Sequence, residues 1–286
     1  MVELKFVTAG SADLVLAPEI GGAIARLDVN GKPVLRPWSG KTLEPFSFAN
    51  NVLIPFSNRI SGGGFYWNGV YYKLKPNISE EDFPIHGDGF KRKWSFSARE
   101  KKIRMSLNNG SFGPWRYKAV QEFELSQNSL KINLVVTNKG SVTLPFGFGF
   151  HPWFPRSSDT RLSFSAEGLW LEDLQHLPTR EISLERGSVW EFSRMRPLPN
   201  TWINNCYTGW RGKARIKQGL DAVSCSISSS KNLNNAIIYS PNSKSSFFCF
   251  EPVSHPVDAF NLPFKPGLSE IGFEESLISS ITLSWN

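Results

Sequence analysis

Apolar and polar residues alternate with a period of two along much of this chain. Every second residue is apolar in residues 94–98, 103–107, 130–136, 223–227 and 281–285. Successive side chains of a β-strand point to opposite faces of a sheet, so this alternation is typical of strands with one buried face. No window of about 12 residues has the 3.6-residue apolar period of an amphipathic helix. The pattern therefore predicts a protein made almost entirely of strands.

Turn signals between the alternating runs indicate how the strands connect. Asn30–Gly31 and Asn68–Gly69 each fit a tight β-hairpin, because both residue types tolerate the positive φ that such turns need. The 286 residues include 23 glycines and 19 prolines, and many short strands in succession favour a large antiparallel β-sandwich or barrel. Neither a repeat nor a linker divides the sequence, so we predict an all-β chain with one domain over residues 1–286.

Charge and hydropathy exclude several classes of protein. Lys and Arg number 32 against 25 Asp and Glu, and the longest basic cluster is residues 91–93. A nucleic-acid-binding protein more often has a dense basic stripe interleaved with aromatic residues. No signal-peptide pattern opens the sequence, and no stretch approaches the roughly 18 apolar residues of a membrane span. We therefore expect a cytoplasmic protein that binds neither nucleic acid nor a membrane.

The cysteines and histidines form no recognisable metal or disulfide pattern. Cys206, Cys225 and Cys249 are too few and too scattered for a disulfide framework or a zinc site, so we expect small buried hydrophobic residues. No two histidines have the spacing of metal ligands. The chain also lacks a Gly-x-Ser-x-Gly elbow and a complete dinucleotide fingerprint. We therefore predict neither a metal nor a cofactor.

Four segments depart from the strand pattern and contain the candidate functional residues. They are residues 58–65, 84–90, 147–154 and 267–277. Arg59 precedes three glycines, where it is either a fixed hydrogen-bond donor or a surface residue beside a strand bend. His86 can present its imidazole into a cleft, and His151, which lies among aromatic residues, suits the wall of a sugar or aromatic pocket. The alternative for either histidine is a satisfied residue of the core or of a turn. The three glutamates of the last segment either form a solvated loop or include a carboxylate that acts as a base.

Six motifs, taken together and in chain order, resemble those of the aldose 1-epimerase (galactose mutarotase-like) family. They are residues 21–31, 55–60, 85–94, 149–154, 204–210 and the C-terminal stretch 251–277. Each motif is modest alone, but six in the right order are specific, and they span roughly residues 20–285. The resemblance implies a β-super-sandwich fold and an isomerase that interconverts the α and β anomers of a free aldose.

The resemblance also implies a role for each candidate residue. His151 is assigned as the general acid and Glu275 as the general base, whereas Arg59, His86 and Asn204 would bind the sugar. Ring opening needs a proton taken from the anomeric hydroxyl and another given to the ring oxygen, and reclosure on the other face reverses both transfers. An imidazole and a carboxylate suit this exchange. Because no redox step occurs, the reaction needs no cofactor or metal.

The sequence departs from the family pattern at two positions. Asn204 stands where the family usually has an aspartate, so a charge-assisted hydrogen bond to the sugar would weaken. The C-terminal loop has Phe273–Glu274 where the family usually has Pro-Gly, which leaves both Glu274 and Glu275 as candidates for the base. The following Ser276–Leu277 favours Glu275.

Two other functions remain open from the sequence. A hexose-6-phosphate 1-epimerase shares the fold and the reaction, but it would need basic residues at the far end of the sugar. A non-catalytic carbohydrate-binding protein on the same fold would have no need of an acid and a base together. The expected partner in each case is a small-molecule sugar, with the protein a monomer or homodimer.

Overall fold

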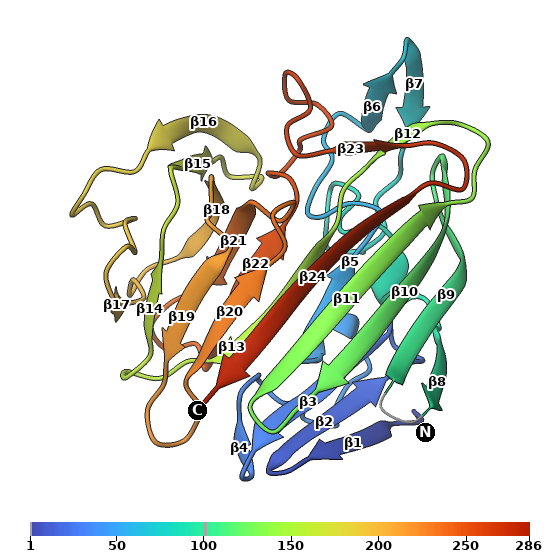
Figure 1. Ribbon diagram of the computed structural model, residues 1–286. Coiled ribbons are helices and arrows are strands. Elements are labelled where there is room, and N and C mark those ends of the chain that lie inside the picture. The colour runs from blue at the N-terminus through green and yellow to red at the C-terminus, as the bar shows by residue number, and fades with distance from the viewer. Residues whose placement is uncertain (1, 100–101) are drawn as a thin grey trace.

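The computed structural model describes residues 2–99 and 102–286, and two large antiparallel sheets make up most of them (Figure 1). The strands of the 11-stranded sheet, in spatial order, are β1 (Lys5–Ala9), β2 (Ala12–Ala17), β3 (Ala23–Val29), β5 (Asn50–Leu53), β13 (Gly149–Pro155), β22 (Phe247–Val253), β21 (Asn235–Ser240), β18 (Ile203–Thr208), β15 (Gly168–Glu172) and β16 (Pro178–Ser183), with β4 (Lys32–Pro33) paired to β3. This sheet contains the first strands of the chain and several of its later ones, so segments far apart in sequence lie side by side.

The second large sheet has nine strands and contains the C-terminal strand. Its spatial order is β17 (Arg196–Pro197), β14 (Arg161–Phe164), β19 (Lys213–Lys217), β20 (Cys225–Ser229), β24 (Ser276–Trp285), β11 (Ser129–Asn138), β10 (Trp115–Leu125), β9 (Lys102–Phe112) and β8 (Ser95–Arg99). The smaller elements are the hairpin β6 (Gly64–Trp67) and β7 (Val70–Lys73), the pair β12 (Leu144–Phe146) and β23 (Ser269–Ile271), and the 3₁₀-helices η1 (Pro45–Ser47) and η2 (Gly89–Lys91).

One large cluster of buried side chains includes residues from both sheets. Leu14 and Ile238 contribute to it from the 11-stranded sheet, and Leu107 and Ile281 contribute from the nine-stranded sheet. Strands with one apolar face bury that face by packing against a second sheet. The prediction of an all-β, large antiparallel sandwich is therefore confirmed. The described residues contain no helix with the length and apolar character that a membrane crossing requires.

The period-two pattern marks strands, although not always their first residue. Every second residue of β11 is buried, including the whole apolar set that the sequence predicts over residues 130–136. The predicted strands over 94–98 and 223–227 instead begin at Ser95 and Cys225. Alternation identifies which face is buried, whereas the hydrogen-bond ladder decides where a strand begins.

Both predicted Asn-Gly hairpins are confirmed. Asn30 and Gly31 join β3 to β4 with φ of 50° and 74°, and Asn68 and Gly69 join β6 to β7 with φ of 48° and 78°. Positive φ at both central residues produces a turn whose twist matches that of the flanking strands. The β6–β7 hairpin projects from the two large sheets (Figure 1).

Two loops next to β5 are held together by backbone pairing, and this pairing positions His86. Ile54 forms an isolated bridge to Gly87, and Arg59 forms one to Ile85. His86 has a positive φ of 58°, and the next residue, Gly87, has a φ of 65°. A Cβ on Gly87 would lie 2.1 Å from the carbonyl oxygen of Ile54, so no larger residue fits this approach. The His-Gly pair thus turns the chain sharply beneath the site described next.

Candidate active site

A cavity of about 460 Å³ opens at the middle of the 11-stranded sheet and brings distant segments together. Strands β13, β18, β21 and β22 contribute to its walls, together with the loops around residues 58–59, 80–86 and 174–176. Four of the five predicted site residues line it: Arg59, His86, His151 and Asn204. This volume lies in the range of small-molecule sites.

His151 and Glu251 face each other at the buried end of the cavity. Strands β13 and β22 pair antiparallel, with Gly149 opposite Val253 and Trp153 opposite Cys249, so the register sets His151 opposite Glu251. The distance between Nε2 of His151 and Oε1 of Glu251 is 3.5 Å, and their side chains are 8% and 3% exposed. Glu251 is not among the site residues predicted from the sequence.

Burial shifts the pKa of both members of this pair towards the neutral form. Desolvation raises the pKa of Glu251 to about 8, against a smaller opposing effect of Arg59. Desolvation also lowers the pKa of His151 to about 3, helped by the positive charge of Arg36. Between these two values the pair holds one proton, whichever residue bears it at a given moment. One group able to donate a proton therefore lies beside one able to accept it.

A backbone contact fixes the tautomer of His86. The N–H of Asn58 donates to Nδ1 of His86 over 2.9 Å, and a neutral imidazole has only one N–H. The hydrogen therefore resides on Nε2, which is left to donate to a ligand in the cavity. Burial, followed by the charges of His151 and Arg59, lowers the pKa of His86 well below its ordinary value. His86 is thus a neutral hydrogen-bond donor rather than a cation.

Arg59 lines the cavity, but its guanidinium is already paired. Its Nε donates to Oε2 of Glu81 over 2.7 Å, and its terminal nitrogen donates to Oε1 over 2.6 Å. This two-point contact fixes the plane of the guanidinium and neutralises its charge. Asn58 accepts a further bond of 3.3 Å from the same group through Oδ1.

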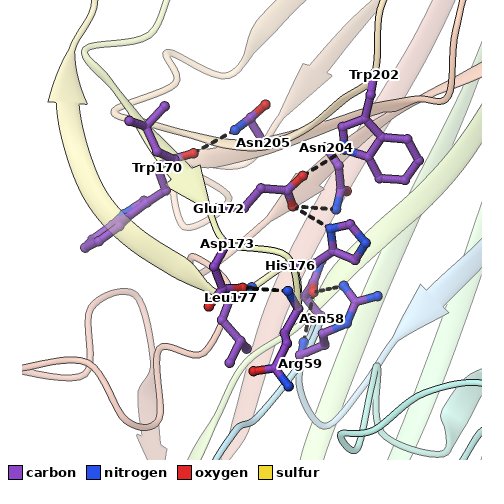
Figure 2. A network of polar contacts seen from close by, with 12 residues as sticks. Asn58, Arg59, Trp170, Glu172, Asp173, His176, Leu177, Trp202, Asn204 and Asn205 are labelled. Carbon is purple, nitrogen blue, oxygen red and sulfur yellow. Dashed lines mark hydrogen bonds and ion pairs between the residues drawn. The ribbon is translucent and has the colours of Figure 1, made fainter.

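Asn204 lies on β18 with its amide bound to a carboxylate from the next strand. Its Nδ2 donates to Oε2 of Glu172 over 2.9 Å (Figure 2). The same carboxylate contacts Nδ1 of His176 at 3.1 Å, and its other oxygen accepts from Nε1 of Trp202 over 2.8 Å. Since the amide nitrogen is engaged, the carbonyl oxygen of Asn204 is the group left to accept hydrogen bonds from a ligand. Sequence reasoning missed Glu172, His176 and Trp202 entirely.

The structure corrects the expectation that Glu275 faces His151. Glu275 lies in the exposed turn between β23 and β24, where its Oε2 accepts the backbone N–H of Gly272 over 2.8 Å. It does not line the cavity. Glu274, the neighbouring candidate, is also exposed and forms an ion pair with Lys139. The segment after Glu275 enters β24 of the nine-stranded sheet, whereas the strands that line the cavity belong to the 11-stranded sheet.

A signal for Glu251 is present in the sequence. It is the only ionisable side chain apart from Cys249 in the apolar run Phe247–Val253, all of which lies in one strand. A carboxyl group is rarely buried in such a run without a function, because desolvation of its charged form is costly. The adjoining motif residues supported the family resemblance, but the glutamate within them was not assigned a role.

One group of side chains could in principle hold a metal ion. The ligand atoms of His151, Cys249 and Glu251 all lie within 4.8 Å of one another. Burial, followed by the charge of Glu251, raises the pKa of the Cys249 thiol well above its ordinary value, which opposes the thiolate that a metal would need. All three cysteines are buried and free, which confirms the prediction of small buried residues.

Comparisons with known proteins identify the family of this chain. Residues 7–272 match the family model described as aldose 1-epimerase. The uncharacterized protein YphB of Escherichia coli K12 is 33% identical over 271 residues, which are 92% of each chain. A crystal structure of a candidate aldose 1-epimerase from Escherichia coli K12 superposes with a TM-score of 0.93 at 31% identity and covers both chains completely.

A more distant structure shares the fold. A galactose mutarotase-like protein from Clostridium acetobutylicum has a TM-score of 0.84 at 18% identity, over all of this chain and 98% of the other. The family match extends over nearly the whole chain and includes every residue described at the cavity. This chain belongs to the aldose 1-epimerase family.

Proposed function

We propose that this protein is an aldose 1-epimerase that interconverts the α and β anomers of a free, uncharged aldose. The observation that supports this most directly is the buried His151–Glu251 pair, in which Nε2 and Oε1 lie 3.5 Å apart on two paired strands. Anomer exchange needs one proton removed and one delivered in the same step. A pair that shares a single proton supplies both functions.

The proposed mechanism starts from the form of the pair in which the shared proton lies on His151. Glu251 then takes the proton of the anomeric hydroxyl while His151 gives its proton to the ring oxygen. The bond between C1 and the ring oxygen breaks, and C1 becomes an aldehyde carbon. Rotation about the C1–C2 bond then presents the other face of the carbonyl. On reclosure the hydroxyl that was formed from the ring oxygen gives its proton to His151, and its oxygen bonds to C1 again. Glu251 returns its proton to the new anomeric oxygen, so the pair ends as it began.

The other predicted residues bind the sugar in this proposal. His86 offers Nε2–H as a donor, because its Nδ1 is already occupied by the backbone of Asn58. Asn204 offers its carbonyl oxygen, because its amide nitrogen is bound to Glu172. Donors and acceptors fixed in advance hold the sugar without reorganisation when it binds.

Two features disfavour a phosphorylated substrate. Arg59 is the one Lys or Arg among the described residues that line the cavity, and its charge is neutralised by Glu81. Glu80 and Asp82 lie on the same rim, so a phosphate would meet carboxylates.

A non-catalytic binding protein is disfavoured for a different reason. Such a protein would bear the cost of burying Glu251 beside His151 without using the pair.

Polarimetry of freshly dissolved α-D-glucose and α-D-galactose, with and without the protein, tests the proposal. We expect mutarotation faster than the buffer blank for at least one free aldose and no comparable acceleration for its 6-phosphate. Acceleration of the phosphate alone would transfer the proposal to a hexose-6-phosphate 1-epimerase. No acceleration across common hexoses and pentoses, combined with saturable sugar binding, would identify a binding protein.

A further inference from the structure

The outer end of the cavity is built from a pair of stacked aromatic rings. The rings of Trp202 and His176 lie 5.3 Å apart with an interplanar angle of 23°. Trp202 is 43% exposed, although a tryptophan of this size usually buries most of its surface. Both residues line the same cavity as His151 and Glu251. The cavity therefore has a buried end with the acid–base pair and an exposed end with a flat aromatic surface.

Glu172 holds this aromatic surface in place. Its carboxylate accepts a 2.8 Å hydrogen bond from Nε1 of Trp202 and contacts Nδ1 of His176 at 3.1 Å (Figure 2). The side chain of Glu172 is only 18% exposed, so these charge-assisted contacts are shielded from water. An exposed ring would otherwise sample several rotamers, and a ring fixed by a carboxylate is already ordered when a ligand arrives.

A continuous aromatic wall joins the two ends of the cavity. Trp202 packs edge-on against Tyr239 at 5.3 Å, and Tyr239 packs edge-on against Trp153 at 6.4 Å. Trp153 in turn stacks on His151 at 4.9 Å with an interplanar angle of 8°. A ligand that places its reacting carbon beside His151 can thus extend along this wall as far as Trp202.

We infer that the Trp202–His176 pair forms a second sugar-binding subsite, and that this enzyme acts preferentially on reducing disaccharides or longer reducing oligosaccharides. The inference rests on the proposed function. The anomeric carbon must lie at the buried end, so the far side of the reducing sugar faces the exposed end. A sugar unit attached there packs the C–H face of its ring on Trp202. The carboxylates of Glu80 and Asp82 in the lining of the same cavity match a neutral, hydroxyl-rich unit and repel an anionic one.

The test compares sugars that share glucose as their reducing unit. Initial rates are measured by polarimetry for glucose, for the 1,4-linked maltose and lactose, and for the 1,6-linked isomaltose and melibiose. We expect kcat/KM for at least one disaccharide to exceed that for glucose by about tenfold, chiefly through a lower KM, because one stacked ring contributes on that order.

The variant Trp202→Ala should then lower the ratio of disaccharide to glucose kcat/KM by about tenfold, and Trp202→Phe should restore most of it. Glu172→Gln should lower the same ratio, because the aromatic surface of Trp202 and His176 loses its charged hydrogen-bond acceptor. A general folding defect lowers both rates and leaves the ratio unchanged, so the ratio separates binding from stability.

The possible failures are distinguishable. If no sugar of either size is accelerated, the proposed function itself fails. If glucose is accelerated but every disaccharide is slower, or if Trp202→Ala lowers both rates equally, the second subsite is refuted and the proposed function stands. Should glucose be a poor substrate and another hexose a good one, the same comparison applies to disaccharides with that hexose at the reducing end.

Discussion

The guanidinium of Arg59 is held by the carboxylate of Glu81 through two parallel hydrogen bonds of 2.7 and 2.6 Å. Glu81 lies in the loop at the cavity rim, 22 residues along the chain from its partner. Because of this contact, Arg59, the one Lys or Arg of the described cavity lining, is not free to bind an anion. In the proposed function, the selectivity of the site against charged sugars therefore depends on a residue of a surface loop.

Glu81→Gln should make the site more tolerant of phosphorylated sugars. Freed from its counter-charge, Arg59 can bind a phosphate, and a hydrogen bond to a charged group contributes about 1.5–3 kcal/mol. We expect the ratio of kcat/KM for glucose 6-phosphate to that for glucose to rise by about tenfold or more. Glu80→Gln is the matched control, since it removes the same charge from the same loop without altering the contact with Arg59. Equal ratios in both variants would contradict this role of Glu81.

Glu251→Gln should abolish most activity while the sugar still binds. The substitution keeps the shape of the side chain and removes the base, so kcat should fall by about 10²–10⁴-fold. His151→Asn should have a similar effect, and the double variant should be little worse than the worse single variant, because the residues act as a unit. Glu275→Gln is the control and should retain wild-type activity. Loss of turnover in Glu275→Gln alone would instead restore the assignment made from the C-terminal motif.

The rate should depend on pH through the single proton of the His151–Glu251 pair. Burial raises the pKa of Glu251 to about 8 and lowers the pKa of His151 to about 3. Above about pH 8 the pair loses its proton and no acid remains, so kcat/KM falls. Below about pH 3 both residues are protonated and no base remains. Polarimetric rates from pH 5 to 10, after subtraction of the buffer-catalysed rate, should show the alkaline limb near pH 8. A rate that stays constant to pH 10 would exclude this pair as the proton source.

Asn204→Asp should impair the enzyme, even though aspartate is usual at this position in the family. The new carboxylate would replace the amide nitrogen that donates to Glu172 over 2.9 Å, so two negative charges would meet. We expect KM to rise by about tenfold and the melting temperature to fall. The double variant Asn204→Asp with Glu172→Gln restores one donor between the two strands and should recover both quantities. No recovery would indicate that Asn204 and Glu172 are not coupled.

Activity should survive removal of metal ions. The thiol of Cys249 has a pKa well above its ordinary value because of burial, so the His151–Cys249–Glu251 group is a poor metal site near neutral pH. Rates before and after dialysis against EDTA should agree within error. A loss that one divalent ion restores would overturn the metal-free mechanism, and Cys249→Ser would then identify whether this group binds the ion.

The sequence predicts the fold well because the relevant signals are local. The alternation in β11 and the Asn-Gly pair before β7 each depend only on residues that are close together in the sequence. The site is harder to predict, since its geometry depends on which strands pair. Glu251 reaches His151 only because β13 pairs with β22 in one register, across a hundred residues of sequence.

The prediction of Glu275, which does not line the cavity, has the same origin. Its loop contains three glutamates, and nothing within the loop indicates that it lies away from the cavity. Glu172 had no local signal either, because its role is defined by Trp202 and His176, which approach it from other segments. Residues that act through long-range contacts become apparent only when the pairing of the strands is known.

The pairing of β13 with β22 has a consequence for how such a protein can evolve. His151 and Glu251 are separated by the spacing between two central strands, which hydrogen bonds on both sides of each strand keep constant. Other residues of the cavity lining, among them Glu81 and His176, lie on loops, which tolerate insertion and exchange. New sugar preferences can therefore arise by loop replacement, one loop at a time, while the proton-transfer chemistry is inherited unchanged from the sheet.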